Sequence, residues 1–207
     1  MKNPSSKDLE KLALNAKEIA KKVAACQDWQ PIVVEFAGTP KSGKSTNIDV
    51  LNHFLRRSEF KVAAPTEGVS KRTPYNLKSD LMAYNSWALC YAISELLVGY
   101  YNVDKPHVVM LDRGPFDSLA WMLHLRENGK LSNEEYRIIY HFVTLDKWEK
   151  IVKRIYLFTC DPKLSLKREL EEKLIRVSGL VMNEERLIQL KEQYDILKAD
   201  LNFESKL

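Results

Sequence analysis

The sequence predicts an α/β domain with a mostly parallel sheet, and two features support this fold class. Four short apolar runs, PIVVEFAG, FKVAAPTEG, HVVMLDRG and RIYLFTCDP, have the form of strands buried on both faces of a parallel sheet. Each run is followed by a stretch with helical periodicity. Strands that alternate with helices build a parallel sheet, so we expect the functional residues at the carboxyl ends of the strands.

We expect the chain to begin with a helix that lies outside this domain. Ser5 and Asp8 have the spacing of a capping box. Apolar residues then recur at helical spacing, at Leu9, Leu12, Ala16, Ile19, Ala20 and Val23. The chain is therefore divided into an N-terminal helical extension, residues 1–30, and one domain, residues 31–207. The extension has no recognisable catalytic residue and is expected to pack against the sheet or a partner subunit.

Helix boundaries inside the domain are also readable. Ser132 and Glu135 form a second capping-box pattern, and Asp161 precedes a proline that suits the first turn of a helix. The last helix should pack on the sheet through one apolar stripe, Leu187, Leu190, Tyr194, Leu197 and Leu201.

Composition narrows the function classes. A chain of 207 residues with 45% hydrophobic residues can bury one proper core. The net charge of +4 and the lack of a basic, aromatic-studded stripe argue against nucleic-acid binding. The N-terminus lacks a continuous apolar block, and the three scattered cysteines suggest neither a disulfide framework nor a zinc site. We therefore expect a cytoplasmic protein that does not bind membranes.

The stretch GTPKSGKS matches G-x-x-x-x-G-K-[ST] between a predicted strand and a predicted helix, which is the context of a phosphate-binding loop, the P-loop or Walker A motif. Its glycines let backbone N–H groups converge on one anion at the positive end of the helix. We expect nucleotide contacts from Gly38, Thr39, Pro40, Lys41, Ser42, Gly43, Lys44, Ser45 and Thr46. Lys44 should reach the β- and γ-phosphates, and the Ser45 hydroxyl should ligate Mg²⁺.

Asp112 ends the third apolar run and is the expected second Mg²⁺ ligand. Nucleotide phosphates held by such a loop need Mg²⁺, and a carboxylate from a neighbouring strand end commonly helps to hold the ion. An aspartate at this position could instead cap a helix or turn. The predicted loop beside it favours the metal role.

Two segments beyond the loop carry a family resemblance. DRGPFDSLAW resembles the DR-x-x-x-S-S-x-A-[YF] signature of thymidylate kinases and their deoxynucleoside kinase relatives, with Asp117 in place of the first serine. IYLFTCDPKLSLKRE is similar to their strand, Asp/Pro turn and helix that leads into a lid over ATP. With the phosphate loop, the resemblance spans residues 31 to about 176.

This resemblance implies a P-loop NTPase three-layer sandwich, with a parallel sheet of about five strands between helices. It also implies transfer of the γ-phosphoryl group of ATP to a nucleoside or nucleoside monophosphate. Arg113 and Arg168 would add positive charge around that group, and a short lid would lie near residues 165–182. Members of the superfamily are often homodimers, so a homodimer is also implied.

The departures from thymidylate kinases concern the acceptor. Ala37 stands where they carry a glutamate before the loop, TEGVSKR replaces R-x-P-G, and Trp87 lies near the position of an acceptor-binding arginine. Deoxynucleoside kinases instead place a general base after the second strand, where this chain has Glu67. A base helps a neutral hydroxyl acceptor more than an anionic phosphate. The alternative for Glu67 is a solvated loop carboxylate.

Other side chains could take part in the site. Tyr75, Tyr84, Asn85, Trp87 and Tyr91 could form an acceptor pocket, although aromatic residues in a helix are more often core. Arg168, Lys173 and Arg176 could close over phosphates, or could instead form surface i,i+4 pairs such as Lys167–Glu171. Glu35 lies within a buried strand and should meet Arg113 or a backbone N–H near the loop.

We therefore predict an ATP- and Mg²⁺-dependent nucleoside or nucleotide kinase, with Lys44, Asp112, Arg113, Glu67 and Arg168 as catalytic residues. The alternative is a regulatory module that holds a nucleotide as a switch and has no small-molecule kinase activity. A phosphate loop by itself does not distinguish the two.

Overall fold

The computed structural model of the chain describes residues 5–26, 28–64, 72–172 and 182–200. The strands are β1 (Ile32–Gly38), β2 (Val62–Ala63), β3 (Val108–Asp112) and β4 (Val152–Phe158). The helices are α1 (Ser6–Ala25), α2 (Lys44–Arg57), η1 (Tyr75–Ser79), α4 (Leu81–Tyr100), α5 (Pro115–Glu127), α6 (Asn133–Val143), α7 (Asp146–Glu149), α8 (Pro162–Glu172) and α9 (Glu184–Lys198). The expected capping boxes are present at the starts of α1 and α6.

The sheet is parallel, with the strand order β2-β3-β1-β4. Within the described residues it has four strands, of the roughly five that the family resemblance implies. β1 lies between β3 and β4, and Phe36 of β1 is paired with Asp112 of β3. The carboxyl end of β1 therefore lies beside the carboxyl end of β3, so residues that follow these strands meet at one edge of the sheet.

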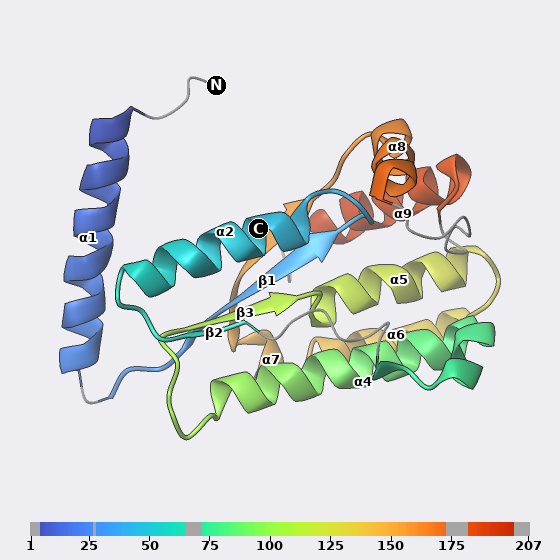
Figure 1. Cartoon of the computed structure of the whole chain (residues 1–207). Helices are drawn as coiled ribbons and strands as arrows, with labels where there is room; N and C mark the ends of the chain where they lie inside the picture. Colours follow the sequence, from blue (N-terminus) through green and yellow to red (C-terminus); the bar gives the residue numbers. More distant parts are fainter. Residues whose placement is uncertain (1–4, 27, 65–71, 173–181, 201–207) are drawn as a thin grey trace.

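Helices cover both faces of the sheet, which confirms the three-layer α/β architecture. In Figure 1, α2 lies over one face, and α4, α5 and α6 lie over the other. Side chains alternate along β1: Val34 and Phe36 pack in a cluster with Ile48 of α2, whereas Val33 and Ala37 belong to the larger cluster that includes α4 and α5. Because both faces are covered, β1 is apolar at nearly every position.

Helix α9 packs through the stripe that the sequence predicts. Leu187, Leu190, Tyr194 and Leu197 are all buried. Leu201, the last member of the predicted stripe, lies outside the described residues. The helix contacts α5 and α8, so its buried stripe extends the core on that side of the sheet.

Helix α4 is long and apolar enough, by length and composition alone, to cross a membrane. The core helix of a globular domain passes the same test, which makes this weak evidence for a span. Leu89, Ile93 and Leu96 are buried, and α4 contacts α5 and β3. α4 is therefore a core helix, and its apolar composition follows from this packing.

Helix α1 stands at one end of the sandwich, beside the end of α2 (Figure 1). Ala16 and Ala20 are buried, whereas Leu9, Leu12 and Ile19 are each about half exposed, at 52%, 53% and 52%. The helix that the sequence predicts is therefore present and packs mainly through small residues. The division of the chain at residue 30 stays a prediction.

Gly38, the last residue of β1, is fixed by its backbone and by the neighbouring strand. Its φ angle is 136°, a region that L-residues rarely adopt. A Cβ atom built there would lie 1.8 Å from the carbonyl oxygen of Phe158 in β4. The close approach of β4 therefore requires glycine here. Gly129 has a positive φ of 65° but nothing within 4 Å of an added Cβ atom.

We predict that Gly38→Ala lowers the free energy of unfolding by more than about 4 kcal/mol, because the methyl group collides with backbone that cannot move independently. Gly129→Ala is the matched control and should cost about 1 kcal/mol, since it has only the left-handed conformation to accommodate. Chemical denaturation of both variants measures the difference. Equal losses of unfolding free energy in the two variants would contradict the claim that the close approach of β4 requires glycine at position 38.

Candidate functional site

The phosphate-binding loop leaves the carboxyl end of β1 and folds around one lysine. Lys44 is the first residue of α2, and its side-chain Nζ donates hydrogen bonds to the carbonyl oxygens of Gly38 at 3.0 Å and Thr39 at 2.8 Å. Lys41 and Gly43 have positive φ angles of 57° and 97°, which bend the backbone between β1 and α2. The loop thus encloses the ammonium group, which is 5% exposed.

The start of α2 has the character of an anion site. Its first turn contains no acidic residue, and its N-cap, Gly43, supplies no side-chain hydrogen bond to the first amides. The amide dipoles of the helix and the ammonium group of Lys44 therefore act at the same end of the loop. The predicted nucleotide contacts form this one continuous segment, Gly38–Thr46, and their roles remain predictions.

Ser45 and Asp112 meet as the sequence predicts. The Ser45 hydroxyl donates to Oδ2 of Asp112 at 2.9 Å, although the two residues are 67 positions apart. A hydroxyl beside a carboxylate offers hard oxygen ligands, and Mg²⁺ prefers a few such protein ligands together with water and substrate phosphates. No group of three or more His, Cys, Asp or Glu residues with metal-binding geometry occurs in the described part of the chain. The pair fits Mg²⁺ held jointly with phosphates.

Arg113 follows β3 directly and adopts a strained backbone, with a φ angle of 66°. Its backbone N–H donates to the carbonyl oxygen of Phe36 at 3.0 Å. The guanidinium Nη1 donates to Asp117 Oδ2 at 2.8 Å and lies 3.5 Å from the carbonyl oxygen of Gly38. Its Cζ atom is 5.8 Å from the ring centre of Trp121. Arg113 therefore lies between the phosphate loop and the first turn of α5.

Glu35 holds the start of α5 from within the sheet. Its carboxylate accepts hydrogen bonds from the backbone N–H groups of Gly114 at 3.1 Å, Phe116 at 3.2 Å and Asp117 at 2.7 Å. The sequence suggested either Arg113 or a backbone N–H as the partner of Glu35, and in the structure the carboxylate accepts from backbone N–H groups. Gly114 is required because a Cβ atom there would lie 2.5 Å from the carboxyl carbon of Glu35. The role of Glu35 is therefore structural support of the site.

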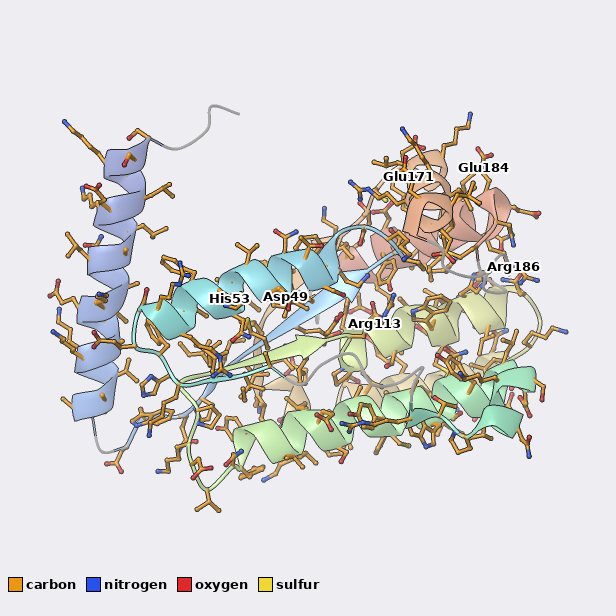
Figure 2. All side chains as sticks on the ribbon, viewed as in Figure 1. Asp49, His53, Arg113, Glu171, Glu184 and Arg186 are labelled. Carbon is orange, nitrogen blue, oxygen red and sulfur yellow. The ribbon has the colours of Figure 1, made fainter. Side chains whose placement is uncertain are left out.

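A cavity of about 370 Å³ adjoins the phosphate loop between α4 and α5. Its lining combines loop, helix and strand-end residues: Pro40, Leu81, Tyr84, Asn85, Ala88, Ala92, Arg113, Asp117, Ser118, Trp121, His124, Leu125, Asn128, Lys130 and Arg186. Figure 2 shows Arg113 at the first turn of α5 and Arg186 beside the far end of that helix. The cavity thus extends along α5, away from the loop.

The predicted aromatic pocket is divided between two faces of α4. Tyr84 and Asn85 line the cavity. Trp87 and Tyr91 are not among its lining residues and stack on each other, with ring centres 5.4 Å apart and an angle of 4° between the rings. The side chain of Tyr75 lies outside the described residues. The aromatic group on the opposite wall is Trp121, which the sequence indicates only as the aromatic position of the family signature.

His124 adds a neutral polar group to the cavity wall. Burial and the neighbouring positive charge of Arg186 lower the pKa of His124 below its ordinary value. The imidazole is therefore uncharged at neutral pH, with one nitrogen able to donate a hydrogen bond and the other able to accept one. The sequence pattern did not indicate His124, because its place in the cavity wall depends on the packing of α5 against α4 and on Arg186 of α9.

Helix α8 supports the outside of the loop. Ser165, which is 1% exposed, donates to the carbonyl oxygen of Pro40 at 3.0 Å. Arg168 donates from Nη1 to the carbonyl oxygen of Lys41 at 2.9 Å, and Lys41 pairs with Glu169 at 3.3 Å. In this structure Arg168 contacts the loop backbone, and its predicted role toward ATP phosphates stays a prediction. Lys167 and Glu171 form the expected i,i+4 pair at 3.8 Å.

Glu67, the expected general base, lies outside the described residues. So do Lys173 and Arg176 of the expected lid. Their roles stay predictions.

We predict that Glu35→Gln removes a pH dependence of stability. Burial raises the pKa of Glu35 from 4.5 to about 8, although its three backbone hydrogen bonds oppose this rise. Between these values the folded protein binds more protons than the unfolded chain, so the stabilising contribution of the protonated carboxyl is lost as the pH rises. Denaturation at about pH 5 and about pH 8 should show a smaller fall in stability for the variant. Identical falls would contradict the raised pKa.

Ser165→Ala should lower the free energy of unfolding by about 1 to 2 kcal/mol, because it leaves the partly buried carbonyl oxygen of Pro40 without its donor. The exposed Ser79 makes a similar bond, to the carbonyl oxygen of Asn76 at 2.8 Å. Ser79→Ala is the matched control and should stay within about 0.5 kcal/mol of the unmodified protein. If both variants behave alike in denaturation, α8 does not support the loop.

No family model and no curated protein matches the chain. Solved structures do: deoxyadenosine kinase from M. mycoides with dCMP and a flexible dCDP bound is 16% identical, with a TM-score of 0.62 over 83% of this chain and 88% of that chain. The same kinase with bound dATP is 15% identical, with a TM-score of 0.59 over 82% and 86%. The expected resemblance is thus confirmed at the level of the fold: this chain shares the parallel α/β fold of these deoxyadenosine kinase structures.

Proposed function

We propose that this protein is a kinase that transfers the γ-phosphoryl group of Mg-ATP to a nucleoside or nucleoside monophosphate. The observation that supports it best is the cavity beside the phosphate loop. Pro40 of the loop and Arg113 at the end of β3 line this cavity together. A nucleotide switch needs only the loop, whereas a kinase needs a second site within reach of the transferred group.

The donor side of the proposed site consists of the loop and α2. Lys44 and the amide groups at the start of α2 would bind and orient the phosphates. Ser45 and Asp112 would hold Mg²⁺, which supplies neutralisation of charge on the phosphate oxygens when bound. These groups are already in place, because Lys44 is held at 3.0 and 2.8 Å and Ser45 contacts Asp112 at 2.9 Å. Little reorganisation is then needed during transfer.

The acceptor side consists of α4 and α5. Tyr84 and Trp121 offer flat apolar surface for a base, while Asn85 and the neutral imidazole of His124 offer hydrogen-bonding groups. Arg113 lies at the end of the cavity next to the loop, where its guanidinium could neutralise charge on the transferred group. The base that would activate a hydroxyl acceptor is expected to be Glu67.

The solved structures of similar fold support the proposal that this chain binds nucleotides. The deoxyadenosine kinase of similar fold has been solved with dATP, and with dCMP and dCDP. Nucleotides of this kind are suitable first ligands to test on this chain. Whether the acceptor is a nucleoside or a nucleoside monophosphate is decided by which of the two raises ADP release.

The test is ADP release from Mg-ATP in the presence of deoxynucleosides, ribonucleosides and their monophosphates. We expect one acceptor class to raise ADP release, and Lys44→Ala and Asp112→Asn each to lower turnover by about a hundredfold or more, because each removes charge stabilisation at the phosphates. Lys22→Ala is the control: its side chain is 72% exposed on α1 and pairs with Glu18, so turnover should be unchanged.

The outcomes separate the two candidate functions. Acceptor-dependent turnover that both site variants abolish supports the kinase. Tight binding of Mg-ATP without turnover for any acceptor would instead support a nucleotide-dependent switch. Turnover that survives both site variants would mean that the activity does not come from this site.

A further inference from the structure

We propose that Asp117 is a positioning residue that fixes the guanidinium group of Arg113 relative to Gly38, the first residue of the phosphate loop. The inference rests on the proposed kinase function. Asp117 is 1% exposed. Its Oδ2 accepts from Arg113 Nη1 at 2.8 Å, and its Oδ1 accepts from the backbone N–H of Gly38 at 2.9 Å and from the hydroxyl of Tyr194 at 2.6 Å. One carboxylate therefore joins the acceptor side of the site to the donor side.

The backbone of Gly38 is where these contacts converge. Its N–H is held by Asp117, and its carbonyl oxygen accepts from Lys44 at 3.0 Å, with Arg113 Nη1 3.5 Å away. Lys44 and Arg113 are two of the three cations expected around the transferred group, and both therefore contact the carbonyl oxygen of Gly38. A serine, which the family motif has at position 117, has a single side-chain oxygen one bond closer to the backbone. It offers fewer acceptor positions than a carboxylate.

Asp117 is itself rigidly placed. Its backbone N–H is bound by Glu35 at 2.7 Å, which fixes the first turn of α5 to the centre of the sheet. Burial raises the pKa of Tyr194 well above its ordinary value, so its hydroxyl remains a donor toward Oδ1. A carboxylate held from the sheet and from α9 can impose a direction on the longer, more mobile side chain of Arg113.

Arg113 needs such a partner. Its positive φ angle of 66° is a strained conformation for a residue with a side chain, and strain of this kind persists where the surroundings impose it. Its guanidinium is also 5.8 Å from the ring centre of Trp121, so it lies along the cavity wall. A displacement of about 1 Å in a charge that stabilises the transition state can lower turnover by about a hundredfold.

The decisive variant is Asp117→Asn. The amide oxygen can still accept from Gly38 and Tyr194, whereas the amide nitrogen that replaces Oδ2 cannot accept from Arg113. We expect kcat to fall by about tenfold to a hundredfold, while KM for ATP changes by less than about threefold. Tyr140→Phe is the matched control. It removes a tyrosine-to-aspartate hydrogen bond of the same kind, to Asp200 at 2.6 Å, from residues that do not line the cavity, so it should lower stability but keep kcat within about twofold.

A double-mutant cycle separates positioning from a general structural role. If Asp117 acts through Arg113, Asp117→Asn should lower kcat in the natural background and have no further effect in the Arg113→Ala background. Additive losses in the cycle would overturn the inference. So would an Asp117→Asn protein that keeps its natural kcat.

A measurement without substrate keeps the inference testable if the kinase assignment fails or if Asp117→Asn does not fold. Arg113→Ala removes one partner of the carboxylate, so the backbone amide resonance of Gly38 should shift in the NMR spectrum of the ligand-free protein. An unmoved resonance would overturn the coupling, whatever the activity. Absence of turnover in the unmodified protein together with a shifted resonance would refute the kinase proposal alone.

Discussion

The hydrogen bonds from the first turn of α5 to the carboxylate of Glu35 are the constraint on which the rest of the site depends. They join β1 to the start of α5, whose N-cap, Gly114, lies 79 residues after Glu35, and they leave no space for a side chain at Gly114. A buried carboxyl group is unfavourable unless its oxygens are hydrogen-bonded, and here three backbone N–H groups donate to them. This contact sets where Arg113, Asp117 and the cavity lie relative to the loop.

The phosphate loop is held from two sides before any ligand binds. Lys44 and Asp117 hold Gly38 at the base of the loop, while Ser165 and Arg168 of α8 hold the carbonyl oxygens of Pro40 and Lys41 on its outside. Both sets of contacts use buried or half-buried groups, where hydrogen bonds exchange least with water. A loop held in this way would need little rearrangement to receive the phosphates that the proposed function requires.

The sequence predicted the acceptor pocket only in part, and the composition of α4 explains why. This helix is apolar on most of its surface, so its periodicity does not indicate which face meets α5 and which meets another part of the chain. Tyr84 and Asn85 line the cavity, whereas Trp87 and Tyr91 stack on one another away from it. The opposite wall depends on the packing of α5 and α9, which brings together Trp121, His124 and Arg186.

The sequence by itself determined the alternation of strands and helices, the phosphate loop and the pairing of Ser45 with Asp112. These follow from local patterns: apolar runs, turn-forming glycines, and the rule that parallel strands end at one edge. Only the tertiary structure decided that Glu35 supports α5, that Asp117 joins Gly38 to Arg113, and that Arg168 meets Lys41. The physical reason is that the role of a charged side chain depends on its burial and on partners far away in the chain. Neither can be inferred from the residues next to it in the sequence.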